Sequence, residues 1–237
     1  MDIAQLLKIV QSAYSMAASG TGTRDVILDA LDRLLATSGF RGITMDDVAA
    51  EAGVSRRTIY MYFAGKEELG LSSIDRVVAG TYARLERIAG GGGDPAEVLH
   101  AMLVERVLFR VDSVHSYRTS LDELFEAVRP AYMARRRQQH EREVGLIARV
   151  IAGGCAAGRF ECDDAAAVAG TVVAATNAFL PYSLSVQELG ERGRIAAGID
   201  RMASLMIKSL TAGAPGVAGP RRVTTRRAPA RARRSRT

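Results

Sequence analysis

The sequence predicts an all-α protein, and three observations support this fold class. Apolar residues recur at steps of three and four along several long segments, which is the period of an amphipathic helix. Only 6 prolines are present, and most of the 23 glycines gather in a few clusters, so long stretches are free to form helices. Hydrophobic residues make up 48% of the chain but aromatic residues only 5%. We therefore expect a core made mainly of aliphatic side chains on packed helices.

Two amphipathic helices are expected at the start of the chain. Residues 2–19 carry apolar side chains at helical spacing until Ser19-Gly20, and we assign them to a helical N-terminal extension, residues 1–22. The second helix is expected to begin at Thr23 as its N-cap and to end at Gly39. Within it, pairs of apolar residues repeat every four positions. Both segments therefore have one face that must pack against another element.

Residues 44–63 predict two short helices joined by a tight turn. Thr44 and Asp47 have the spacing of a capping box at the start of the first helix. Gly53 suits the left-handed turn that ends it, and Ser55 is placed to cap the second helix. We expect Ile59 and Tyr62 to return the second helix to a shared core. This arrangement is typical of a helix-turn-helix.

The second of these helices would present a basic and polar outer face. Arg56, Arg57, Thr58, Tyr60 and Met61 lie at or near that face. An arginine fork matches guanine O6 and N7, hydroxyl groups suit phosphate oxygens, and a helix N-terminus attracts anions. These residue types therefore point to binding in the major groove of DNA.

The middle of the chain predicts a series of longer helices. One runs from Lys66 to Ile88, and the glycine run at 90–93 breaks it. Asp94-Pro95 is expected to begin the next helix. Ser120 and Glu123 have capping-box spacing before a short helix that Arg129-Pro130 should end, and a longer helix then runs to Ile151.

Two helices are expected near the C-terminal end of this region. Asp163 is placed to cap an uncharged helix in which Gly170, Ala174 and Ala178 form a stripe of small side chains. A capping box from Ser185 to Glu188 opens the last helix. We expect these two helices to form the interface of a homodimer.

Charge is concentrated at the C-terminus. Residues 212–237 hold eight arginines and no acidic residue, so subtracting them from the formal net charge of +6 leaves −2 for residues 1–211. This tail is expected to be disordered. It would either add sequence-independent attraction to phosphates or serve only as a solubilising end.

Several functional classes are disfavoured by composition. The chain has 3 histidines and no metal-ligand cluster, and neither a nucleophile motif nor a cofactor motif is evident, so we expect no metal, no cofactor and no catalytic residues. Cys155 and Cys162 match no common zinc or redox spacing, and we interpret them as reduced thiols, with a redox switch as the alternative. Residues 165–187 are uncharged but too polar for a membrane span, and no signal peptide is indicated, so a cytoplasmic location is expected.

The run from Thr23 to Leu69 resembles the DNA-binding domain of the TetR family. The likeness rests on Gly39-Phe40, Thr44-Met45-Asp46-Asp47-Val48-Ala49, Gly53-Val54-Ser55, Thr58-Ile59-Tyr60, Tyr62-Phe63 and Lys66-Glu67-Glu68-Leu69. It implies a helix-turn-helix domain at 23–69, followed by a helical ligand-binding and dimerisation domain at 70–211. It also implies a homodimeric regulator, usually a repressor, that binds double-stranded DNA and a small-molecule effector.

The resemblance also implies residue roles. The positions that match DNA contacts are Thr44, Ser55, Arg56, Arg57, Thr58, Tyr60, Tyr62 and Lys66, where Lys66 corresponds to a lysine that pairs with a phosphate. Asp46 departs from the pattern, because relatives often place a basic or polar residue there. For the effector, the candidates on the helices that line the cavity in similar proteins are His100, Phe109, His115, Phe125, Tyr132, Asn177, Phe179 and Tyr182. They suggest a mainly apolar ligand with one or two polar anchors.

Two rival functions stay open at this stage. A helix-turn-helix protein without ligand control could act as an architectural DNA-binding protein through its basic tail. A helical enzyme is the second rival, although no recognisable catalytic group supports it. The preferred function is a ligand-responsive repressor acting on a near-palindromic operator, whose half-sites would lie roughly 34 Å apart.

Overall fold

The computed structural model describes residues 22–211, and all of its secondary structure is helical. The described region contains no strand, which confirms the all-α prediction. The predicted N-terminal helix and the basic tail lie outside the described residues. Within the described part, no helix combines the length and the apolar character needed to cross a membrane.

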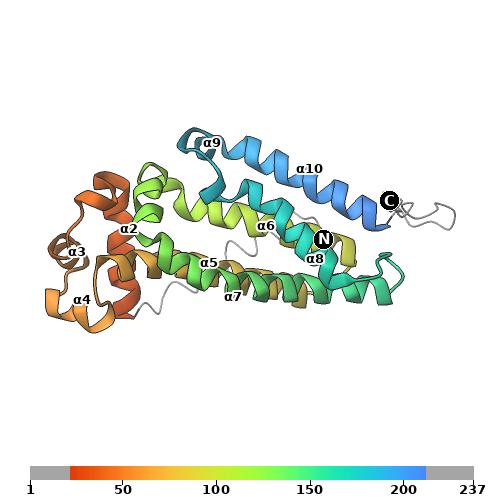
Figure 1. Ribbon diagram of the computed structural model, residues 1–237, viewed down its shortest axis with the longest axis horizontal. Coiled ribbons are helices and arrows are strands. Elements are labelled where there is room, and N and C mark those ends of the chain that lie inside the picture. The colour runs from red at the N-terminus through yellow and green to blue at the C-terminus, as the bar shows by residue number, and fades with distance from the viewer. Residues whose placement is uncertain (1–21, 212–237) are drawn as a thin grey trace, which may run out of the picture.

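The first three described helices lie together at one end of the elongated molecule (Figure 1). They are α2 (Thr23–Gly42), α3 (Met45–Ala52) and α4 (Arg56–Tyr62), and we call this group the head. One detail of the predicted α2 was wrong, because Gly22 is the N-cap instead of Thr23. Gly39 interrupts the regular helix as predicted, since its φ of 69° and ψ of 156° are not helical, and a short helical segment follows this bend. The bend directs Phe40 into the core, where only 1% of it is exposed.

Three long helices run along the body of the molecule. They are α5 (Lys66–Gly90), α6 (Pro95–Val114) and α7 (Leu121–Ala156), with the short 3-10 helix η1 (His115–Ser120) between the last two. Asp94 caps α6 ahead of Pro95, as predicted. In Figure 1, α5 and α7 run side by side away from the head, and these helices are also in contact.

The structure corrects two predictions for α7. Ser120 does not cap a helix, because its hydroxyl donates to the carbonyl oxygen of Leu35 at 2.5 Å. Pro130 does not end a helix either, since α7 continues through it. Pro130 and Glu126, whose carbonyl would have received the missing hydrogen bond, both lie on the exposed face, where water can replace that donor.

The C-terminal region is more broken than predicted. It contains α8 (Ala165–Thr176), the 3-10 helices η2 (Asn177–Phe179) and η3 (Pro181–Ser183), and then α9 (Val186–Gly190) and α10 (Arg192–Thr211). Asp164 caps α8, where Asp163 was expected. The Ser185–Glu188 capping box is present, but the helix that it opens ends at Gly190, before α10 begins.

Two cysteines that are seven positions apart meet at the end of α7. The sulfur atoms of Cys155 and Cys162 lie 2.7 Å apart, and both residues are free cysteines. The hydrogen bond with Cys155, followed by desolvation, raises the pKa of Cys162 to about 11. Cys162 is therefore a protonated thiol at neutral pH.

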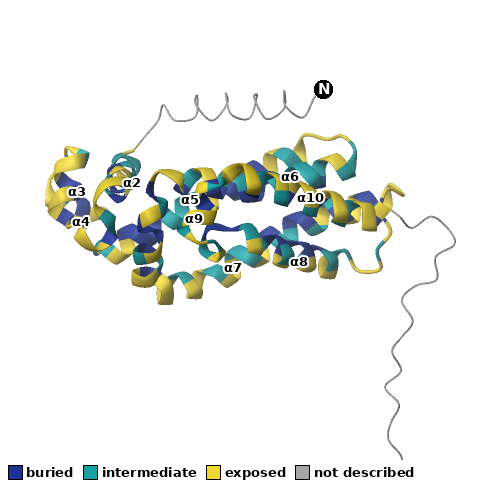
Figure 2. Ribbon diagram, turned by 90° about the horizontal axis from the view of Figure 1, so that it is seen from above, coloured by how far each residue is buried: buried dark blue, intermediate teal, exposed yellow. Residues whose placement is uncertain are grey.

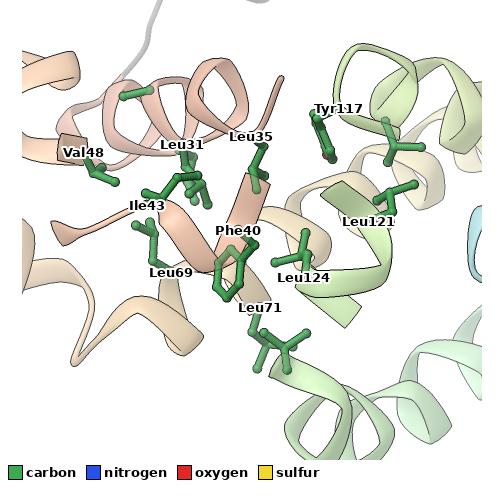
Figure 3. Close-up of a cluster of buried hydrophobic side chains, with 14 of the residues drawn as sticks. Leu31, Leu35, Phe40, Ile43, Val48, Leu69, Leu71, Tyr117, Leu121 and Leu124 are labelled. Carbon is green, nitrogen blue, oxygen red and sulfur yellow. The ribbon is translucent and has the colours of Figure 1, made fainter. Parts of the chain in front are cut away.

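Buried side chains form a continuous core that links the head to the body. Figure 2 shows buried residues along the inner faces of the helices and exposed residues on their outer faces. At the junction, Phe40 and Ile43 from the head lie in one cluster with Leu71 of α5 and with Tyr117 and Leu124 (Figure 3). The head is therefore packed onto α5, η1 and the start of α7.

Candidate nucleic-acid interface and internal cavity

The helix-turn-helix forms for the local reasons that the sequence indicates. The Thr44 hydroxyl accepts from the Asp47 backbone N–H at 3.2 Å, and the Asp47 carboxylate accepts from the Thr44 N–H at 2.8 Å. Gly53 has φ 67°, in the left-handed region that glycine adopts without strain. Ser55 then caps α4 by accepting from the Thr58 N–H at 3.0 Å.

The outer face of α4 is open to solvent and rich in polar groups. Arg56 and Arg57 are exposed there, together with Tyr60 and Met61. The prediction that Tyr62 returns to the core was wrong, because 43% of Tyr62 is exposed. The next residue, Phe63, takes the core position with 1% exposure, so Tyr62 joins the open face.

Arg56 is held by two neighbours on this face. Its Nη1 donates to both oxygens of Asp46, at 2.8 and 3.2 Å. Its Nη2 lies 3.5 Å from the Tyr60 hydroxyl, and its guanidinium is 5.6 Å from the centre of that ring. Asp46, the residue that departs from the family pattern, therefore orients an arginine instead of standing alone.

Three other predicted DNA contacts already have partners within the protein. Lys66 donates to the carbonyl oxygens of Phe40, Arg41 and Ile43, at 2.9, 3.2 and 2.8 Å. Those contacts occupy the three donors of its ammonium group and fix the end of α2 to the start of α5. The Thr44 hydroxyl and the Ser55 hydroxyl are both engaged in helix capping.

Charged groups also fix the head to α5. Arg76 donates to Asp29 at 2.6 Å and to Asp32 at 2.7 Å, and the Ser73 hydroxyl donates to Asp32 at 2.8 Å. Burial raises the pKa of Asp32, although the Arg76 charge opposes this shift. The orientation of the head relative to α5 is therefore fixed by ion pairs and a hydrogen bond as well as by the buried core.

An internal cavity of about 70 Å³ lies in the body between α5, α6, α7 and the η2–η3 segment. Phe125, Tyr132 and Tyr182 form an aromatic series along it. The ring centres of Phe125 and Tyr132 are 5.6 Å apart, and those of Tyr132 and Tyr182 are 6.5 Å apart. Apolar residues of α5 and polar residues of α6 and α7 complete the lining.

The structure divides the predicted effector residues into two groups. Phe125, Tyr132, Asn177 and Tyr182 line the cavity. The other four candidates, His100, Phe109, His115 and Phe179, do not.

Each of these four has another location. His100 lies 3.2 Å from Asp200 on α10, and Phe109 packs under the guanidinium of Arg84 at 4.2 Å. His115 is exposed, and Phe179 packs against α10 near Gly198. These four residues lie on elements that border the cavity, but their own side chains do not line it.

A buried ionic cluster, which sequence reasoning missed, forms one wall of the cavity. Arg106 Nε donates to Glu143 at 2.8 Å, and Arg110 pairs with the other oxygen of the same carboxylate. Burial by itself would raise the pKa of Glu143, but the charges of Arg110 and Arg106 lower it overall. Glu143 is therefore ionised at neutral pH, and it is 3% exposed.

A signal for this cluster was present in the sequence. Glu105, Arg106 and Arg110 interrupt the apolar face of α6, and all three are buried. Charged residues are almost never fully buried unless they are paired. Three charges on the buried face of one helix therefore indicate buried partners, although the sequence cannot name Glu143 as one of them.

A capped α3, a glycine turn and an exposed basic α4 define a DNA-binding protein of the helix-turn-helix class. Comparison with known proteins then shows which family this domain resembles. Residues 27–71 match the family model described as "Bacterial regulatory proteins, tetR family". The match covers most of the head and the start of α5, so this part of the chain is similar to the DNA-binding domain of that family.

Named relatives are also described as transcriptional regulators. Over 78 residues the chain is 38% identical to the HTH-type transcriptional regulator EthR of Mycolicibacterium smegmatis. That match covers 33% of this chain and only 36% of EthR. The sequence similarity to this relative therefore extends over about a third of each protein.

Solved structures show that the whole helical fold is shared. A transcriptional regulator from Cytophaga hutchinsonii is similar with a TM-score of 0.65 and 19% identity, covering 81% of this chain and 100% of the other. FadR from Bacillus subtilis, solved in complex with stearoyl-CoA, gives a TM-score of 0.54 at 14% identity, covering 78% and 98%. At these identities the likeness establishes the fold.

Proposed function

We propose that the protein is a ligand-responsive repressor that binds a near-palindromic operator as a homodimer. In this proposal a small, mainly apolar effector enters the internal cavity and releases the DNA. The observation that carries it is that α7 and η1 contribute side chains both to the cavity and to the junction with the head. Any movement of these elements at the cavity is therefore transmitted to the DNA-binding helices.

Two adjacent residues of α7 illustrate this connection. Leu124 is buried in the junction core near Phe40 of the head, while Phe125 lines the cavity. On η1, Tyr117 lines the cavity and is also part of the junction core. The charge of Asp32 in the head adds to the effect of burial in raising the pKa of Tyr117, so the two groups are near neighbours.

The size of the cavity supports a conformational response. Sites for drug-sized ligands usually have volumes of about 300–1,000 Å³, whereas this cavity has about 70 Å³. An effector of ordinary size would therefore either extend out of this space or displace the elements that line it. A coupling free energy of about 1–3 kcal/mol between the two sites would change operator affinity about 5- to 150-fold.

The proposed DNA contacts are the groups that α4 leaves accessible. Arg56, Arg57, Tyr60 and Tyr62 are exposed on one side of the head. We assign base reading to Arg56, whose orientation is fixed by Asp46, and phosphate contacts to the tyrosine hydroxyls. Thr44, Ser55, Thr58 and Lys66 hold the two helices and the head in the geometry that this contact requires.

The proposed dimer interface is the outer surface of α8 and α10. Ala174 is exposed on α8, and small side chains allow two helices to approach closely. The predicted stripe of small residues does not continue on the same helix, because α8 ends at Thr176 and Ala178 lies in η2, where it is also exposed. On α10, 66% of Leu205 is exposed, so this helix offers a large apolar side chain to a partner. Size measurement by light scattering would test this: Ala174→Arg should convert a dimer to a monomer, whereas a wild-type monomer would contradict the proposal.

DNA binding is tested by fluorescence polarisation on genomic fragments upstream of the protein's own gene. The proteins compared are wild type, Tyr60→Ala and a deletion after Ala212. We expect specific binding to be lost in Tyr60→Ala and retained after the deletion. The opposite pattern would assign DNA binding to the basic tail and would favour the architectural function.

A further inference from the structure

One buried nitrogen in the cavity wall has no hydrogen-bond partner among the described residues. It is Nη1 of Arg110, a residue that is 9% exposed and lines the cavity. A buried guanidinium N–H without an acceptor carries an uncompensated loss of hydration. An acceptor placed in the cavity would remove this cost.

Each nitrogen of Arg106 and each carboxylate oxygen of Glu143 already has a partner. Arg106 uses its three nitrogens on Glu143, on the Thr176 hydroxyl at 2.9 Å and on Asn177 Oδ1 at 2.7 Å. Glu143 accepts one arginine on each carboxylate oxygen. The protein therefore provides a complete set of partners for Arg106 but an incomplete one for Arg110.

The charge of the lining points to the kind of acceptor required. Among the described lining residues, Arg106, Arg110 and Arg136 are positive and Glu143 is negative, with His140 beside them. Arg136 is bound to the Tyr182 hydroxyl at 3.2 Å and lies over that ring at 5.1 Å. Three guanidiniums against one carboxylate leave an excess of positive charge, which favours an anionic ligand group over a neutral one.

The side of the cavity formed by α5 has the opposite character. Ile74, Val77 and Val78 line it, and Phe125 of α7 adds an apolar ring. A ligand that occupies the whole space would therefore meet both arginine side chains and hydrocarbon side chains.

We propose that the effector is an amphiphilic carboxylate. Its carboxylate accepts a hydrogen bond from Arg110 Nη1, and its apolar body extends along α5. This inference rests on the proposed function, because it names the chemical class of the molecule that the regulator senses. It also identifies Arg110 as the residue that selects for charge.

The test compares matched pairs of probes by isothermal titration calorimetry on the full chain. The probes are straight-chain carboxylates of four to ten carbons and the primary amides of the same lengths, which have nearly the same shape without the charge. A charge-assisted hydrogen bond predicts that the best carboxylate binds about 10- to 100-fold tighter than its amide. This comparison needs no variant, so a folding defect cannot obscure it.

Two substitutions assign the preference to Arg110. In Arg110→Met, where Glu143 keeps Arg106 as its partner, the preference for carboxylate should fall to within about threefold. The matched control is Arg142→Met, on α7 next to Glu143 and outside the cavity lining, which should keep the full preference. If no carboxylate binds tighter than its amide, or if the preference survives in Arg110→Met, the inference is overturned.

Operator polarisation with the tightest probe separates this inference from the proposed function. If a neutral amide binds as tightly as its carboxylate and releases the operator, the proposed ligand-responsive function is supported. The inferred selection for a carboxylate is then contradicted. If the carboxylate binds tighter than its amide by the expected factor but does not change operator affinity, the inferred binding site is supported and ligand control of DNA binding is contradicted.

Discussion

The two arginine–carboxylate arrangements in this protein differ in burial, and this difference separates their roles. Arg56 and Asp46 pair on the surface of the head, with side chains 57% and 66% exposed. Arg106 and Glu143 pair beside the cavity, with side chains 2% and 4% exposed. Water can replace either partner of the surface pair, so Arg56 can exchange Asp46 for another acceptor, as the proposed base contact requires. The buried cluster has no such replacement, so the loss of Glu143 should cost much more stability than the loss of Asp46.

The largest expected effect comes from making the same chemical change in both arrangements. Glu143→Gln removes the carboxylate that compensates two buried guanidiniums, and it should lower the free energy of unfolding by about 3–5 kcal/mol. Asp46→Asn, which changes carboxylate to amide on the surface, should leave stability unchanged. Urea denaturation followed by circular dichroism measures both. Equal losses of unfolding free energy in the two variants would show that burial does not distinguish the surface ion pair from the buried cluster.

A second comparison contrasts two neighbouring residues of α7. Leu124→Ala leaves a hole in the junction core and should cost about 2–5 kcal/mol, with loss of operator binding as the head loosens. Phe125→Ala should cost less, because Phe125 is only partly buried and already borders the cavity. It should also allow longer carboxylate probes to bind. Thermal unfolding and calorimetry together distinguish these effects, and identical behaviour of the two variants would contradict the division between junction and cavity.

The acid dependence of stability provides a smaller test of the buried cluster. The arginines lower the pKa of Glu143 below its ordinary value of 4.5, so its ionised form stabilises the folded state above that value. This contribution is lost as pH falls from about 4.5 through the folded-state pKa. Unfolding measured between pH 7 and 3 should therefore show a shallower acid decline in Glu143→Gln than in wild type. Parallel curves would mean that Glu143 is not the titrating group.

The smallest expected effect concerns the orientation of Arg56. Asp46→Asn removes a negative charge near DNA, so non-specific affinity should rise roughly twofold to fivefold, while the ratio of operator to non-specific affinity falls. Glu51→Gln is the matched control, because Glu51 also lies on α3 and pairs with Arg33 of α2, at 2.5 Å. Polarisation titrations on operator and scrambled DNA measure both. If Asp46→Asn leaves the ratio of operator to non-specific affinity unchanged, the orienting role of Asp46 is contradicted.

Features that depend on local geometry were predicted well. The capping boxes at Thr44 and Ser185, the cap at Asp94 and the left-handed turn at Gly53 all appear where the sequence indicates. Each depends on contacts within a few residues, so short-range spacing carries the information. Local rules failed where a distant partner competed. The Ser120 hydroxyl, for example, bonds to Leu35 in the head instead of capping its own helix.

The sequence by itself determined the helical class, the helix-turn-helix and the likeness of residues 27–71 to a known DNA-binding domain, because periodicity, caps and one glycine turn depend on neighbouring residues. Only the tertiary structure decided the cavity and its chemistry. Arg106 meets Glu143, Thr176 and Asn177, which lie 37, 70 and 71 positions further along the chain. Which charges are buried together, and which nitrogen is left without a partner, depends on how α6, α7 and η2 pack. No local pattern in the sequence specifies that packing.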